Sequence, residues 1–234
     1  MVDGPQVIFG SRNAEIRDNV VFFTSTGINI SEGSNHIRVS GNHVEPMPTL
    51  NKDAGGGCIF FRTEPQPLVT AISDIVVTGN IFRDQTTRAK RTVGFQTRKE
   101  AVACAYQGIT FTGNVFDGDL SFFDHTSPAK TTIRDIVFAD NICEGDLASV
   151  PETIMQSSRV LIRGNIFRKS GDLALHASRW IWSANSQTGG SLAITAGAAA
   201  NVIQNNTTTA PISDHGTATV LAGNVVIKTP AVGP

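Results

Sequence analysis

Charged residues, tyrosine and cysteine are all scarce in this chain of 234 residues. Asp, Glu, Lys and Arg together make up 17% of it, and the formal net charge is −1. A surface with so little positive charge does not suit nucleic acid, so we expect no nucleic-acid partner. The three cysteines, Cys58, Cys104 and Cys143, are far apart and form no zinc-binding pattern with histidine. They are predicted to be buried free thiols, and we expect no metal or other cofactor.

Long apolar runs are absent as well. No stretch of 18 apolar residues occurs, so the sequence predicts no membrane-spanning helix. The opening residues, MVDGPQVIFG, have no basic segment followed by an apolar one, and we therefore expect no secretory signal peptide. The chain is instead rich in turn-forming residues, with 22 glycines, which is typical of all-β proteins.

A repeated motif runs along the chain, in which an apolar strand leads into a corner at asparagine and a second apolar pair follows. Clear copies read SGNHV, TGNIF, TGNVF, RGNIF and AGNVV. A repeat that spans the chain determines the architecture before any single motif does. The corner asparagines are Asn19, Asn42, Asn80, Asn114, Asn141, Asn165, Asn185, Asn205 or Asn206, and Asn224.

Apolar residues alternate on both sides of each corner. Around Asn114, for example, they occupy the positions of Ile109, Phe111 and Phe116. A period of two indicates β-strands, and equivalent residues of successive copies should stack in columns inside a core. One such column contains Phe82, Phe116 and Phe167, interrupted by Cys143.

The asparagine at each corner has a physical explanation. Asparagine tolerates the left-handed backbone conformation better than most residues, and its amide can bond to the asparagines above and below it. A third strand should precede each of these strand–corner–strand units. We expect the third strands at residues 8–9, 27–31, 58–62, 93–96, 120–123, 153–156, 173–176, 192–195 and 212–215.

Three short strands per turn predict an all-β parallel solenoid. Its regular coils, about nine in number, should cover residues 7–227, followed by a short tail at 228–234, so that 1–234 form a single domain. These residues resemble the right-handed parallel β-helix superfamily of pectin lyase-like proteins, and phage tailspikes in particular. The TGNIF-type corner matches the asparagine turn between the second and third sheets of that family.

The resemblance implies a right-handed parallel β-helix and a place on the virion surface, as a phage tail or capsid appendage in contact with other virion proteins. An extracellular location is the alternative. The family includes lyases, hydrolases, epimerases, adhesins and inert fibres, so the resemblance does not fix an activity. No cap helix is recognisable at either end, which indicates either a fragment or ends that dock onto other virion parts.

The residues four positions before each corner should face outward, yet most are aliphatic. A lone solenoid would leave such a stripe in water, so we expect a subunit interface, most simply a side-by-side homotrimer, as in tailspikes. The alternative is that valine and isoleucine are merely good strand formers. The stripe consists of Val76, Val137, Leu161, Ile181 and Val220.

Some coils contain long insertions, at 62–72, 96–106 and 123–133 on one side of the third strands and at 43–56, 81–92 and 143–152 on the other. Loops on a rigid scaffold commonly bind ligands, so the third strands should form the floor of a groove. Aromatic, amide and charged side chains suit sugar rings, although ordinary solvated loop residues would look similar. The candidate substrate-binding residues are Phe60, Arg62, Gln96, Arg98, Tyr106, Phe123, Gln156 and His176.

The sequence does not decide whether the protein is an enzyme. Glycoside hydrolysis needs two carboxylates, about 5 Å apart for retention or roughly 6.5–9.5 Å for inversion. The predicted floor has no carboxylate in the central coils, so acids must come from the groove walls or from a cleft between subunits. The candidate catalytic residues are Glu64, Glu100, Asp124 and His125.

The sequence therefore favours a tailspike-like virion protein that recognises a bacterial surface polysaccharide, either with or without cleaving it. If it is an enzyme, we expect a glycoside hydrolase or a polysaccharide lyase. A non-catalytic structural or decoration β-helix of a virion or cell-surface fibre is the second interpretation, and a secreted polysaccharide lyase is the third.

Overall fold

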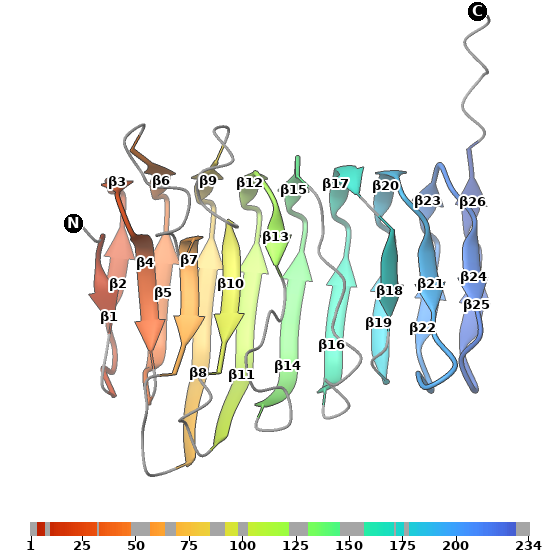
Figure 1. The fold of residues 1–234 in the computed structure, drawn as a ribbon, viewed down its shortest axis with the longest axis horizontal. Helices are drawn as coiled ribbons and strands as arrows, with labels where there is room; N and C mark the ends of the chain where they lie inside the picture. Colours follow the sequence, from red (N-terminus) through yellow and green to blue (C-terminus); the bar gives the residue numbers. More distant parts are fainter. Residues whose placement is uncertain are drawn as a thin grey trace, which may run out of the picture.

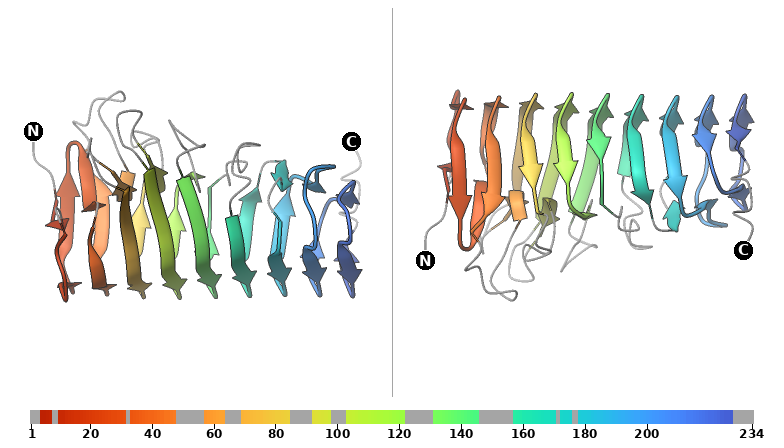
Figure 2. Two further views of the ribbon diagram at one scale, coloured as in Figure 1. Left: turned by 90° about the horizontal axis from the view of Figure 1, so that it is seen from below. Right: turned by 90° about the horizontal axis from the view of Figure 1, so that it is seen from above.

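The structure is a computed structural model in which strands of the same kind stack in parallel along one axis (Figures 1 and 2). It describes residues 4–7, 10–31, 33–47, 57–63, 69–84, 92–97, 103–121, 131–145, 157–170, 172–175 and 178–227. These residues form an all-β fold without helices, consistent with the expected parallel β-helix. Accordingly, no helix suited to crossing a membrane is found among them.

Strands that precede the corner form one parallel sheet, called here the upstream sheet. Its central strands are about twice as long as its outer ones, because they continue further away from the corner. The sheet contains, in spatial order, β2 (Glu15–Arg17), β5 (Asn35–Ser40), β8 (Val69–Thr78), β11 (Ala103–Thr112), β14 (Thr131–Ala139), β16 (Ser157–Arg163), β19 (Trp180–Ser183), β22 (Val202–Gln204) and β25 (Val220–Ala222).

Strands that follow the corner form a second parallel sheet, the downstream sheet. It has the same number of strands, nine, as the upstream sheet. Its members are β3 (Val20–Phe23), β6 (His43–Pro46), β9 (Ile81–Arg83), β12 (Val115–Asp117), β15 (Ile142–Cys143), β17 (Ile166–Ser170), β20 (Ser186–Gly189), β23 (Thr207–Thr208) and β26 (Val225–Val226).

The third strands form two smaller parallel sheets, one of five strands and one of three. Their bounds agree with the expected third strands to within one residue wherever those residues are described. The strands expected at 8–9 and 153–156 lie outside the described residues, as do residues 122–123 and 176 of two others, and β1 (Gln6–Val7) stands just before the first of these. The five-stranded sheet contains β1 (Gln6–Val7), β4 (Thr26–Ser31), β7 (Gly57–Arg62), β10 (Val93–Gln96) and β13 (Leu120–Ser121), and the three-stranded sheet contains β18 (Leu173–Leu175), β21 (Leu192–Ile194) and β24 (Ile212–Asp214).

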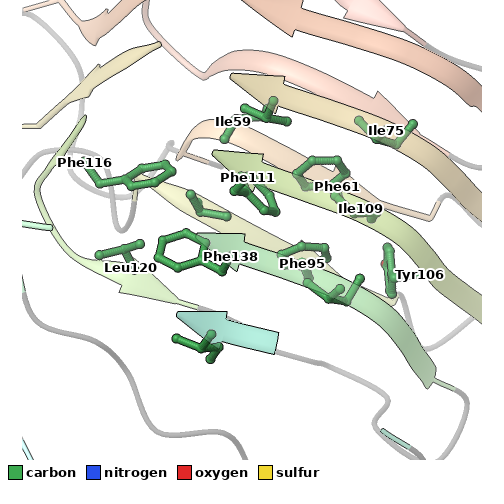
Figure 3. Packing of buried hydrophobic residues seen from close by; sticks show 14 of the residues in the cluster. Ile59, Phe61, Ile75, Phe95, Tyr106, Ile109, Phe111, Phe116, Leu120 and Phe138 are labelled. Atoms are coloured by element: carbon green, nitrogen blue, oxygen red, sulfur yellow. The ribbon is translucent and has the colours of Figure 1, made fainter. Parts of the chain in front are cut away.

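The predicted apolar columns are confirmed and form one core between the sheets (Figure 3). Phe82 and Phe116 stack with ring centroids 5.2 Å apart. Cys143 interrupts this column, and Phe138 of the upstream sheet fills the space, with its ring 5.5 Å from Phe116 and 6.4 Å from Phe167. The aromatic stack therefore continues because two columns contribute to it.

The corner asparagines form the expected ladder of hydrogen bonds. At each step the backbone N–H and the side-chain Nδ2 of one asparagine donate to the Oδ1 of the next, as from Asn80 to Asn114 at 3.0 and 2.9 Å. Nδ2 also donates to a carbonyl of the preceding level, as from Asn114 to Val77 at 3.0 Å. The ladder runs through Asn19, Asn42, Asn80, Asn114, Asn141, Asn165, Asn185, Asn206 and Asn224, so Asn206 and not Asn205 is the corner residue.

The expectation that the corner asparagine itself adopts the left-handed conformation is wrong. The residue before it does so, with φ of 63° at Gly79 and 53° at Ala184, for example. With the bend at the preceding residue, the asparagine's backbone N–H and side-chain Nδ2 both donate along the stack. The left-handed residues are Asp18, Gly41, Gly79, Gly113, Asp140, Gly164, Ala184, Asn205 and Gly223.

A second column of left-handed residues stands five positions before the first, and the sequence analysis missed it. These residues bend the chain at the start of the short segment that leads to the corner. Neighbours in this column form exposed ion pairs, the closest being Arg159 Nε to Asp135 Oδ1 at 2.5 Å. The column consists of Asn13, His36, Asp74, Gly108, Asp135, Arg159, Arg179, Ala200 and Ala218.

The three cysteines are buried free thiols, as expected. Burial raises the pKa of Cys58 and of Cys143. Cys58 Sγ donates a weak hydrogen bond to the carbonyl of Arg83 at 3.5 Å. These thiols therefore act as small core residues.

Candidate ligand-binding face

The outward face of the five-stranded sheet is the predicted groove floor. Strand pairing places Ser31, Arg62 and Gln96 in one column across β4, β7 and β10. Asn29 and Phe60 stand in a neighbouring column of the same face. Paired strands lie about 4.8 Å apart, so these side chains form a compact set of polar and aromatic groups.

This face is more enclosed than the sequence indicated. Phe60 is 4% exposed, Asn29 5% and Ser31 1%, whereas Arg62 and Gln96 are half-buried. Asn29 Nδ2 donates to Gln6 Oε1 at 2.8 Å. Within the described residues, Asn29 Oδ1 and Ser31 Oγ have no hydrogen-bond partner. Both oxygens are themselves buried, so the accessible polar groups of this face are those of Arg62 and Gln96.

Long connections join the strands of this face to the two larger sheets. β6 ends at Pro46 and β7 begins only at Gly57, and β9 and β10 are separated by residues 84–92. On the other side of the same strands, residues 63–68, 97–102 and 122–130 separate β7, β10 and β13 from the upstream strands. The three-stranded sheet has shorter connections, for example residues 215–219 after β24.

Tyr106 is not a groove residue, contrary to the sequence expectation. It lies within β11, where strand alternation turns it into the core with no exposed surface. Its hydroxyl donates to the carbonyl of Gln96 at 2.7 Å, and its ring packs edge-on against Phe95 at 5.3 Å. Tyr106 therefore ties β11 to β10 from inside. Residues 69–72 and 131–133, expected in loops, are likewise parts of the long strands β8 and β14.

The candidate catalytic residues lie outside the described residues. On the outward face of β4, β7 and β10 no described side chain is a carboxylate, so the described groups of this face do not form an acid pair. No three His, Cys, Asp or Glu side chains of the described ranges gather as a metal site either. The candidates outside the described residues are Glu64, Arg98, Glu100, Phe123, Asp124, His125, Gln156 and His176.

The outward aliphatic stripe is where the sequence placed it, on the upstream sheet. Val76 is 39% exposed, Ile181 40% and Val220 51%. Val137 and Leu161 are half-buried. A chain alone in water therefore exposes an apolar stripe on the side of the fold that adjoins the asparagine corner.

Comparison with known proteins gave no match to a family model, to a curated protein or to a solved structure. The function is therefore inferred from the residues of the chain itself.

Proposed function

We propose that this chain is a tailspike-like virion protein, a right-handed parallel β-helix of about nine coils that recognises a bacterial surface polysaccharide. The observation that carries the proposal is the outward face of β4, β7 and β10, where the half-buried Arg62 and Gln96 lie on strands joined to the larger sheets by long connections. Long loops beside a rigid strand face are a frequent location of binding sites.

The chemistry of this face suits a sugar chain. Arg62 offers several N–H donors and Gln96 offers both a donor and an acceptor, which matches the hydroxyl rim of a pyranose. Phe60 is 4% exposed and presents almost no ring surface to a ligand, so the binding chemistry of the described face rests on its polar groups. The regular rise between strands suits a ligand that is itself a repeating chain.

The exposed aliphatic stripe supports a homotrimer as part of this proposal. Val76, Ile181 and Val220 lie along one side of the rod, where burial against a neighbouring copy would remove them from water. The trimer would assemble side by side, with the five-stranded face left free for the glycan.

The binding test uses purified host capsule and lipopolysaccharide in isothermal titration calorimetry. The double variant Arg62→Ala, Gln96→Ala should weaken binding at least tenfold. The matched control is Arg163→Ala, Gln204→Ala, which removes the same two residue types from the outward side of the upstream sheet and should leave binding unchanged. Absence of binding to every host glycan would refute the proposal, as would equal effects of the two double variants.

A non-catalytic structural or decoration β-helix of a virion or cell-surface fibre is the second candidate function, and one observation favours it. The described part of the candidate face has no carboxylate, although glycoside hydrolysis needs a pair. Incubation with a bound glycan separates the two functions. New reducing ends would indicate a hydrolase, and unsaturated uronic acid a lyase, with Glu64, Glu100, Asp124 and His125 as the residues to replace first. Binding without either product would indicate recognition without cleavage, and the absence of both binding and product would favour the structural function.

A further inference from the structure

A second aliphatic column faces outward, on the downstream sheet. It lies one residue after the corner asparagine in four adjacent interior levels, and strand pairing places its members side by side. Ile81 is 37% exposed and Ile166 39%, whereas Val115 and Ile142 are half-buried. These four residues are called here the downstream stripe, and the aliphatic stripe of the upstream sheet is called the upstream stripe.

The two stripes occupy the same levels of the stack. Before the first of these levels both columns are polar, with Arg38 on the upstream sheet and His43 on the downstream sheet. Both then become apolar together, and only Thr110 interrupts the upstream one. The residues of equal level are Val76 and Ile81, Thr110 and Val115, Val137 and Ile142, and Leu161 and Ile166.

Charged residues border both stripes on the sides that lie away from the corner. Beside the downstream stripe they pair with one another, Arg83 Nε with Asp117 Oδ2 at 3.4 Å and Arg168 Nη1 with Glu144 Oε1 at 2.5 Å. Beside the upstream stripe, Asp135 and Arg159 form a similar pair. An apolar strip with a polar rim is the usual arrangement of a protein–protein interface.

The two stripes cannot cover each other within one copy, because the chain turns at the asparagine corner and they lie on different sides of it. Contact between the upstream stripes of two copies, about a twofold axis, would bury one stripe of each copy and leave the other in water. Contact between an upstream stripe and the downstream stripe of the next copy buries both stripes of every copy once the assembly closes into a ring.

We propose that the downstream stripe is the docking surface for the upstream stripe of a second copy. This inference rests on the homotrimer of the proposed function and assigns the second half of its interface. A second copy fits because both stripes have the same rise, about 4.8 Å for each level. A closed ring has no translation along its axis, so side chains of equal level meet, as Val137 with Ile142 of the next copy.

Substitution at one level tests whether both stripes are needed. Leu161→Lys changes the upstream stripe and Ile166→Lys the downstream stripe, and each should convert the trimer of the unaltered chain into a monomer in sedimentation velocity. Ala193→Lys adds the same charge to the outward side of the three-stranded sheet and should leave the trimer intact. Far-UV circular dichroism establishes that each variant is folded. A folded Ile166→Lys variant that remains a trimer would overturn the proposal.

Cross-linking tests the partner surface without introducing charge. The single variants Val137→Cys and Ile142→Cys are produced together and treated with dibromobimane, a short reagent that joins two thiols. The three native cysteines are buried, so the introduced thiols should react first. The proposal requires a covalent dimer in which position 137 of one copy is joined to position 142 of another. Val137→Cys with Ile81→Cys is the control and should not link, because two levels add about 9.6 Å.

The outcomes separate this inference from the homotrimer itself. A trimer in which positions 137 and 142 do not link would overturn the inference and leave the homotrimer in place. Linking of Val137→Cys only to itself would indicate a twofold contact between upstream stripes instead. A monomer of the unaltered chain at every concentration would overturn both the inference and the homotrimer, whereas glycan binding would still be tested by calorimetry.

Discussion

Asn80 donates two hydrogen bonds to one oxygen, the Oδ1 of Asn114, from its backbone N–H at 3.0 Å and its Nδ2 at 2.9 Å. Asn114 is 1% exposed and repeats the same pair of bonds to Asn141. A single side chain therefore satisfies buried groups of the level before it and of the level after it. No other residue type offers an acceptor and two donors at this length.

Asn114→Ala should lower the free energy of unfolding by about 3 kcal/mol or more, because it leaves buried groups of Asn80, Asn141 and Val77 without a partner, each at about 1–3 kcal/mol. Asn19→Ala is the control, since Asn19 is exposed and water can replace its bonds. Its cost should stay under about 1.5 kcal/mol. Urea denaturation followed by far-UV circular dichroism measures both. Equal costs would show that the ladder contributes little beyond the corner geometry.

The left-handed residue before each corner predicts a pair of opposite effects. Ala184 has a φ of 53°, so Ala184→Gly should raise the free energy of unfolding by about 1 kcal/mol, the cost of the left-handed conformation for a residue with a Cβ. Gly79→Ala should lower it by a similar amount, since a Cβ there meets nothing within 4 Å and the backbone strain acts alone. Thermal denaturation of both variants gives the comparison. Destabilisation by Ala184→Gly would contradict this account.

The corner columns could be predicted because hydrogen bonding and burial impose the same residue at every level. The sequence predicts the left-handed conformation at the corner asparagine, whereas the structure has it at the residue before. That residue is a glycine in five levels, Gly41, Gly79, Gly113, Gly164 and Gly223. In the sequence, the Gly-Asn pair is compatible with a left-handed conformation at either residue. Only the backbone angles show that the first residue of the pair adopts it.

The position of Tyr106 could not be predicted from segment lengths. Gly108 interrupts the alternation of β11 with a φ of 62°, which makes residues 103–107 look like part of an insertion. The strand nevertheless continues on both sides of this bend, paired with β8 and β14. A bend inside a strand shifts the apolar alternation by one residue without ending the strand. A prediction from periodicity alone therefore makes the strand too short.

The aromatic stack predicts a large effect of truncation at its centre. Phe116 has no exposed surface and stacks on both Phe82 and Phe138. Phe116→Ala should lower the free energy of unfolding by about 3–5 kcal/mol, the usual cost of a phenylalanine-sized cavity. Ile166→Ala, 39% exposed on the outward side of the downstream sheet, should cost much less. Near-normal stability of Phe116→Ala in urea denaturation would contradict the packing of this column.

The exposed pair of Asp135 and Arg159 predicts a defined dependence on pH. Hydrogen bonds from Arg159 lower the pKa of the Asp135 carboxyl, at 2.5 Å from Nε and 2.6 Å from Nη2. Because the folded-state pKa is depressed, the pair stabilises the fold above the ordinary aspartate pKa, and this contribution disappears as the pH falls through the folded-state pKa. Arg159→Gln should raise the pKa of Asp135 towards its ordinary value in an NMR titration.

Arg163→Gln is the control for this titration, because Arg163 lies beyond the bend on the same strand and forms no ion pair with Asp135. It should leave the pKa of Asp135 unchanged. Added salt should also shrink the difference between the unaltered chain and Arg159→Gln, because both side chains of the pair are exposed to solvent. An unchanged pKa in Arg159→Gln would mean that the pair does not persist in solution.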